Sequence, residues 1–191
     1  MPDAATSTTL PRARELTAAC RRTIVEWHER EAPLDWEVAA PALARAGDGW
    51  PAAVANLCLV NCFQWHLEDE CRTSAAEPAR LAHLKREIDA SNGRRVRAVD
   101  AIDARLAREL GDGGRADASA PVALVTPGNL LDRITILELK RHHARDPEVA
   151  AIVEEQLEDS CLGLDRLVAD LAARRQRMKL YPTVKLYGDG R

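Results

Sequence analysis

One long apolar stripe limits this chain to a helical fold more than any other feature of its sequence. Between Pro78 and Gly111 apolar side chains recur at steps of mostly three and four residues, with no proline among them. The members of the stripe are Leu81, Leu84, Ile88, Val96, Val99, Ile102 and Leu106. Residues spaced in this way share one face of an α-helix, so the pattern predicts a helix from about residue 77 to 110.

The same helical spacing occurs in further segments, several of which begin with a proline in the first turn. The expected ranges are 11–31, 51–72, 126–143 and 146–171, and the irregular segment between the first two leaves room for a short helix at 36–44. Aromatic residues make up only 4% of the chain, as is typical of a bundle rather than a β-sandwich. We therefore expect an all-α, single-domain bundle of four to five helices with long second, third and last helices.

The remaining segments set the expected domain boundaries. Residues 1–10 are small and polar, which predicts a flexible tail, and residues 11–191 form the single helical domain. Residues 111–125 read as a surface loop, and residues 181–187 read as an extended tail.

Charge and composition exclude several classes of partner. The formal net charge is −3, so the chain has no excess of positive charge for nucleic acid. No apolar run approaches the roughly 18 residues needed to cross a membrane. The N-terminus lacks the basic and apolar regions of a signal peptide. Five widely spaced cysteines are an odd number and indicate reduced thiols, so we expect a cytoplasmic protein.

The second long helix carries polar side chains where its apolar face should continue. The first line of polar and aromatic residues along this face contains Asn61, Trp65, Glu68 and Arg72. The line beside it contains Cys62, His66 and Asp69. The later helices carry matching polar groups near their own apolar faces, namely Lys85, Asp89, Asn92, Arg95, Asp132 and Arg133. Because buried charges are costly unless they are paired, the pattern predicts a polar seam shared by three helices.

Three interpretations of this seam remain open. It could be a structural network of ion pairs and hydrogen bonds that fixes how the helices pack. It could instead be a catalytic pocket, in which His66, Glu68 and Asp69 transfer protons. The residues that would then bind the substrate are Asn61, Trp65, Arg72, Lys85, Asn92, Arg95, Asp132 and Arg133, with Arg72 or Arg95 holding an anionic group.

A metal site is the third interpretation. Cys58, Cys62 and His66 follow one another at four-residue intervals and could face one ion. One helix rarely closes a tetrahedral shell, however, so we assign no metal and no cofactor. Trp27 reads as a core aromatic, and the pair His142-His143 reads as a favourable interaction with the C-terminal end of a helix dipole.

Several motifs resemble those of a bacterial family of unknown function, the domain-of-unknown-function family 4254. They are WHER (27–30), NCFQWHLEDECR (61–72), KREIDASNGRR (85–95), VDAID (99–103), TPGNLLDRITILELK (126–140) and VKLYGD (184–189). The resemblance runs from about residue 20 to the end and implies a helical fold. It also implies that the polar positions from Asn61 to Lys140 belong to the family pattern. The family carries no agreed activity.

The resemblance implies a setting in natural-product biosynthesis. Members of the family look to be encoded beside glycosyltransferase-like proteins. This chain is similar in size and type to the small subunit of an azinomycin-type two-subunit enzyme, which forms aziridine rings by sulfate elimination. On this basis we expect a second protein subunit, a small-molecule substrate and proton transfer coupled to loss of an anionic leaving group. The alternatives are a non-catalytic helical partner of another subunit and a metal-dependent helical oxidase.

Overall fold

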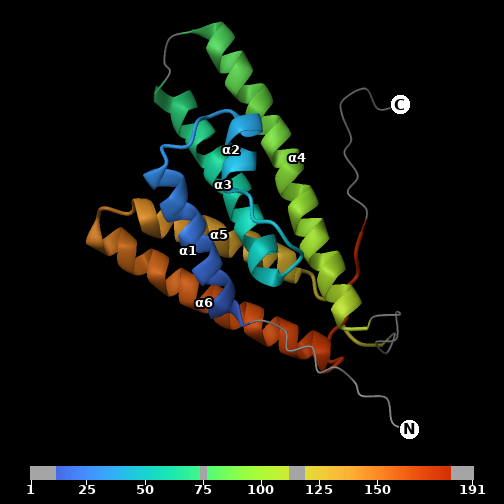
Figure 1. The fold of residues 1–191 in the computed structure, drawn as a ribbon. Coiled ribbons are helices and arrows are strands. Elements are labelled where there is room, and N and C mark those ends of the chain that lie inside the picture. Colours follow the sequence, from blue (N-terminus) through green and yellow to red (C-terminus); the bar gives the residue numbers. More distant parts are fainter. Residues whose placement is uncertain (1–11, 74–76, 112–118, 182–191) are drawn as a thin grey trace.

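Six α-helices account for most of the residues that the structure describes (Figure 1). The structure is a computed structural model, and it describes residues 12–73, 77–111 and 119–181. The helices are α1 (Ala13–Glu29), α2 (Trp36–Leu43), α3 (Trp50–Thr73), α4 (Pro78–Glu109), α5 (Pro127–His143) and α6 (Pro147–Ala172). Within the described ranges the only β-type pairing is an isolated bridge between Val122 and Arg177. The all-α prediction is therefore confirmed.

The expected number of helices was slightly wrong. The additional helix is α2, which lies where the sequence left room for a short helix at 36–44. It begins after Asp35, whose side chain accepts a hydrogen bond from the Glu37 backbone N–H and caps the first turn. The three long helices occur as expected, with 24 residues in α3, 32 in α4 and 26 in α6. The predicted tail at 1–10 and nearly all of the extended segment at 181–187 lie outside the described residues.

Two helical hairpins and the first helix form the bundle. Helices α3 and α4 pair along one side, α5 and α6 pair along another, and α1 contacts α3, α5 and α6 (Figure 1). The C-terminal end of α3 and the N-terminal end of α4 lie far from α6, toward the top of the figure, whereas the opposite end of α4 reaches α5. The face of α3 that looks toward α1 and α5 is covered by these two helices, and it positions the candidate site.

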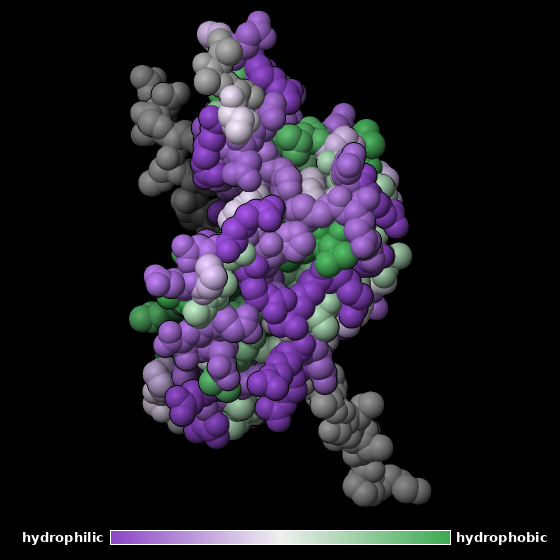
Figure 2. Space-filling view, turned by 90° about the vertical axis from the view of Figure 1, so that its left-hand side faces the viewer, coloured by the Kyte–Doolittle hydropathy of each residue, from purple (hydrophilic) through white to green (hydrophobic). Residues whose placement is uncertain are grey.

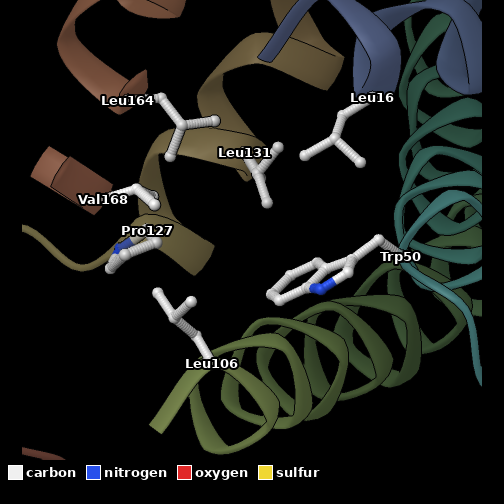
Figure 3. Close-up of a pocket in the computed structure, with 7 residues that line it drawn as sticks. All are labelled: Leu16, Trp50, Leu106, Pro127, Leu131, Leu164 and Val168. Carbon is white, nitrogen blue, oxygen red and sulfur yellow. The ribbon is translucent and has the colours of Figure 1, made fainter. Parts of the chain in front are cut away.

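The apolar core closes the end of the bundle where α4 meets α5 and α6. Side chains from five helices converge there (Figure 3): Leu16, Trp50, Leu106, Pro127, Leu131, Leu164 and Val168. The Trp50 indole N–H donates to Glu109 Oε2 at 2.7 Å, and the Arg105 guanidinium lies 5.0 Å from the Trp50 ring. The polar edge of this large aromatic side chain is therefore satisfied while its ring fills the core.

Helices α4 and α5 touch at the start of α5. Thr126 caps α5 by accepting from the Asn129 N–H, and the buried Asp103 carboxylate accepts from the Gly128 N–H at 2.7 Å. A Cβ atom at Gly128 would lie 2.7 Å from the Val99 carbonyl oxygen, so only glycine fits at this close approach. Burial raises the pKa of Asp103. The Thr-Pro-Gly motif thus joins two helices.

The surface is mixed in character. Figure 2 shows one face on which hydrophilic residues dominate and hydrophobic ones occur in small groups. Among the described residues no helix has both the length and the apolar character needed to span a membrane.

Candidate functional site

The polar stripe of α3 divides into separate contacts rather than one seam. Its first member, Asn61, is buried and donates through Nδ2 to Asp132 Oδ1 at 2.9 Å and to Thr135 Oγ1 at 2.7 Å. The Thr135 hydroxyl in turn donates to the Asp132 carbonyl oxygen. This network joins α3 to α5, and its hydrogen-bonding groups satisfy one another, as expected for a structural network.

A second contact joins α3 to α4. The side-chain amide of Gln64 donates to Asn92 Oδ1 at 3.1 Å and to Glu68 Oε1 at 3.2 Å. Gln64 is buried, whereas Glu68 is half-exposed, so this contact connects the interior to the surface. Sequence analysis placed Asn92 and Glu68 near each other, and the residue that links them is one that it did not select.

The end of the stripe lies at the surface. Arg72 pairs with Asp69 at 2.6 Å and with Glu68 at 3.7 Å, and the pairing with Glu68 has i,i+4 spacing along α3. Lys85 pairs with Asp89 in an exposed position on α4. All three ion pairs are accessible to water and are weak contributors to stability.

The last two arginines of the predicted seam lie apart from these contacts. Arg133 is exposed and donates to Ser160 Oγ on α6. Arg95 is half-buried on α4. In the described part of the chain the contacts of the predicted substrate-binding residues therefore fall into separate groups, and their assigned roles stay predictions.

His66 points away from this polar side and into a cluster of histidines. Its ring centroid lies 5.0 Å from that of His28 on α1 and 5.7 Å from that of His143 on α5. A fourth ring, His142, lies 4.3 Å from His28 and is exposed. Trp65, a predicted substrate-binding residue, stacks on His143 with centroids 5.3 Å apart and an interplanar angle of 6°. Three helices thus supply one imidazole cluster.

Backbone carbonyls fix the orientation of two of these rings. His28 Nδ1 lies 2.7 Å from the Ile24 carbonyl oxygen, and His66 Nδ1 lies 2.9 Å from the Cys62 carbonyl oxygen. Each carbonyl is one helical turn earlier, and it can only accept, so Nδ1 carries the proton and Nε2 carries the free lone pair. Nε2 atoms of His28 and His143 are buried and have no hydrogen-bond partner in the described structure.

Burial favours the neutral form of His66, His142 and His143 by lowering the pKa of each ring. The pKa of His143 falls to about 4, first because burial disfavours the charged ring and then because of the neighbouring His28, His66 and His142. The pKa of His66 is lowered by burial as well, although the Cys62 carbonyl opposes the shift, and the pKa of His142 is lowered for the same first reason. At neutral pH these rings are therefore lone-pair donors rather than cations.

The arrangement suits a metal ion. One nitrogen from each of His28, His66 and His143 lies within 4.8 Å of the other two. Ligands at about 2.1 Å in a tetrahedral shell are about 3.4 Å apart, so small rotations of the rings would bring all three into range. The Nδ1–carbonyl bonds are the kind of outer contact that orients metal-binding histidines.

The cysteines that sequence analysis combined with His66 lie elsewhere. The Cys58 thiol is 2.6 Å from the Cys20 thiol in the core. Cys62 contacts His66 through its backbone carbonyl oxygen. Burial raises the pKa of Cys58 well above its usual value, so this thiol stays protonated at neutral pH. The geometry thus favours a centre built from histidines rather than from thiols.

The predicted site residues did not include His28, His142 or His143. A signal was present, because Trp-His occurs twice, at residues 27–28 and 65–66, and the His-His pair ends another helix. Trp27 proves to be a buried core aromatic that contacts the ring of His66 at 5.5 Å. What the sequence does not give is the helix order in space, which brings these three pairs together.

Comparison with known proteins identifies a family. Residues 51–149 match the model of a family described as "Protein of unknown function (DUF4254)". The matched segment contains His66, His142 and His143, whereas His28 precedes it. No curated protein and no solved structure matches the chain.

Proposed function

We propose that this chain, which belongs to the DUF4254 family, is an enzyme whose reaction centre is a divalent transition-metal ion held by His28, His66 and His143. The observation that supports this proposal is the convergence of three half-buried imidazoles, two of which have buried Nε2 atoms without any partner. An unpaired buried acceptor is unfavourable unless something occupies it. A bound ion satisfies all three lone pairs at once.

The ligand set narrows the choice of ion. Three neutral imidazoles suit Zn²⁺ and its neighbours in the transition series, whereas Mg²⁺ and Ca²⁺ require oxygen ligands. Three protein ligands leave one position of a tetrahedral shell for water or substrate, as in catalytic zinc sites. Such an ion polarises a bound oxygen and stabilises negative charge that develops on it.

The reaction we propose is displacement or elimination of an anionic leaving group from a small biosynthetic substrate. Such a reaction needs positive charge at the departing group. Arg72 is a poor source of this charge, because its guanidinium is already paired with Asp69 and Glu68. An ion at the histidine cluster would provide the charge, and the base role predicted for His66 would then pass to a bound water or to the substrate itself.

Metal binding is the direct test. Metal-free protein is titrated with Zn²⁺ by calorimetry, and Co²⁺ is used as a visible probe of coordination. We expect one tight site per chain, with affinity at least about 100-fold lower in His66→Ala and in His143→Ala, because each removes one of three ligands. His83→Ala is the matched control, since His83 is exposed on α4 and outside the cluster.

The outcomes separate the alternatives. Equal zinc affinity in wild type, His66→Ala and His83→Ala would refute the metal centre. Hydrolysis of an activated ester such as 4-nitrophenyl acetate then tests whether the bound ion is reactive. A rate that follows zinc occupancy supports an open coordination position, and an occupied site without any rate above free zinc shows that the ion is structural.

The role as small subunit of a two-component biosynthetic enzyme stays a prediction. It is tested by co-expression with the protein encoded beside this one, followed by size-exclusion chromatography. A stable complex supports the prediction. A monomer that binds zinc and turns over the biosynthetic substrate alone contradicts the need for a partner and leaves the metal centre intact.

A further inference from the structure

A cavity lies between α2, α3 and α4, away from the histidine cluster. Its volume is about 340 Å³, which is within the range of small-molecule sites. The lining residues are Trp36, Ala44, Asn56, Leu59, Val60, Arg94, Arg97 and Ala98. Leu59 precedes His66 on α3 by about two helical turns, and none of the four clustered histidines contributes to the lining.

The charged side chains that line this cavity are all positive. Two arginines line it and no carboxylate does. In the described part of the chain, neither Arg94 nor Arg97 has an acidic side chain within 4.0 Å, whereas Arg12, Arg21, Arg45, Arg72 and Arg141 all do. Asn56 does not balance their charge, because its side-chain amide is neutral, and that amide is bonded to the Arg45 backbone N–H and carbonyl.

The geometry around Arg94 is fixed. Its guanidinium carbon lies 4.7 Å from the centre of the Trp36 ring, and Trp36 is itself packed edge-on against Phe63 at 5.3 Å. Stacking on an aromatic ring limits the rotation of the guanidinium fork. The Nη1 atom of Arg94 is buried and lacks a hydrogen-bond partner. The Arg94 guanidinium is therefore positioned by Trp36 and has a donor free to bind an acceptor.

The apolar part of the lining defines the rest of the ligand. Leu59 and Val60 are almost fully buried and form an apolar wall beside the arginines. Guanidinium groups bind carboxylate, sulfate or phosphate oxygens in a bidentate manner, and an apolar wall favours a hydrocarbon or ring. We propose that the cavity at Trp36, Arg94 and Arg97 binds a small organic molecule through its oxyanion group, with the apolar part of the molecule against α3.

Binding of phenyl phosphate tests this site separately from the metal centre. The protein is kept metal-free with a chelator, and binding is followed by calorimetry and by the NMR shift of the Trp36 indole N–H, assigned with Trp36→Phe. We expect saturable binding to wild type and to His66→Ala alike. We expect at least about tenfold weaker binding in Arg97→Ala and in Arg94→Gln, because each removes one charged donor.

Arg95→Ala is the matched control. Arg95 adjoins Arg94 on α4 but does not line the cavity, so its loss should leave the affinity unchanged. Arg97 is exposed, so Arg97→Ala keeps the test valid should Arg94→Gln not fold. Phenol and inorganic phosphate separate the two halves of the ligand, and both should bind more weakly than phenyl phosphate.

Three results would overturn the proposal. The first is no saturable binding of phenyl phosphate to the wild type. The second is an equal loss of affinity in Arg95→Ala and Arg97→Ala, which would indicate general attraction to a basic helix. The third is equal binding of phenol and phenyl phosphate, which would mean that the oxyanion is not recognised. Loss of zinc binding in His66→Ala has no bearing on any of them.

Discussion

Asn61 and His66 lie five residues apart on α3, and both carry polar groups into the bundle, but their surroundings differ. The Asn61 amide donates to Asp132 and Thr135, so each of these three side chains has a hydrogen-bond partner. The histidine cluster holds its rings through Nδ1 and leaves buried Nε2 atoms without partners. A satisfied network contributes to folding, whereas converging unsatisfied groups indicate a site that is completed by a ligand.

Zinc should produce the largest difference between the two regions. At a free concentration about 100 times the Kd, Zn²⁺ should raise the free energy of unfolding by about 2.7 kcal/mol. The same increase is expected in Asn61→Ala, whose network lies outside the cluster, and almost none in His66→Ala. Denaturant unfolding with and without zinc measures this. Loss of the zinc effect in Asn61→Ala would mean that the two regions act as one.

Removal of Asn61 should have the next largest effect, on the metal-free protein. Asn61→Ala removes the donor that the Asp132 carboxylate accepts from at 2.9 Å and that the Thr135 hydroxyl oxygen accepts from at 2.7 Å. The cost of such unpaired groups is about 2 kcal/mol of unfolding free energy. Asn129→Ala is the control, because Asn129 is exposed and the change should cost less than about 0.5 kcal/mol. Equal stability of the two variants would contradict a structural role for the network.

His143 should respond in the opposite direction. His143→Phe keeps a ring stacked on Trp65 and removes the buried Nε2 that has no partner. We expect metal-free His143→Phe to equal the wild type or to exceed it by up to about 1 kcal/mol, while zinc affinity is lost. Thermal unfolding and zinc titration of one preparation give both values. A loss of stability above about 2 kcal/mol would assign His143 a structural role.

The same variant sharpens the comparison through pH. His143 is surrounded by His28, His66 and His142, with Asp69 as the opposing charge, and its folded pKa is about 4 against 6.5 unfolded. Below pH 6.5 the unfolded chain therefore binds more protons, so this contribution to stability is lost as the pH falls from about 6.5 to 4. The difference between metal-free wild type and His143→Phe should change across this range. A difference that is independent of pH would contradict the shifted pKa.

The extent to which the sequence predicts this molecule depends on how local each feature is. Apolar spacing and proline positions predict the long helices, because both act within one helix. The end caps at Asp35 and Asp146 are also local. Contacts between helices are not: the close approach at Gly128 depends on Val99, and the histidine cluster depends on α1 and α5 meeting at one turn of α3.

The polar stripe shows the same limit. Its residue types correctly indicated inward polar groups at Asn61 and His66, but one helical face contacts two different neighbours as it runs through the bundle. Sequence alone joined these groups to Arg72 because all follow the same spacing. In space, the stripe passes from the core to the surface within three turns, and its chemistry changes with burial.

Arg72 should therefore give the smallest effect. Its side chain is 69% exposed, and those of Glu68 and Asp69 are 44% and 47% exposed. Surface pairs of this kind contribute about 0.5 kcal/mol or less and are screened by salt. Arg72→Ala should lower stability by no more than this amount and leave zinc affinity unchanged, as measured by unfolding at low and high salt and by zinc titration. A loss of zinc affinity comparable to that of His66→Ala would contradict this separation of Arg72 from the histidine cluster. It would mean that the charge of Arg72 acts on the ion or on its ligands.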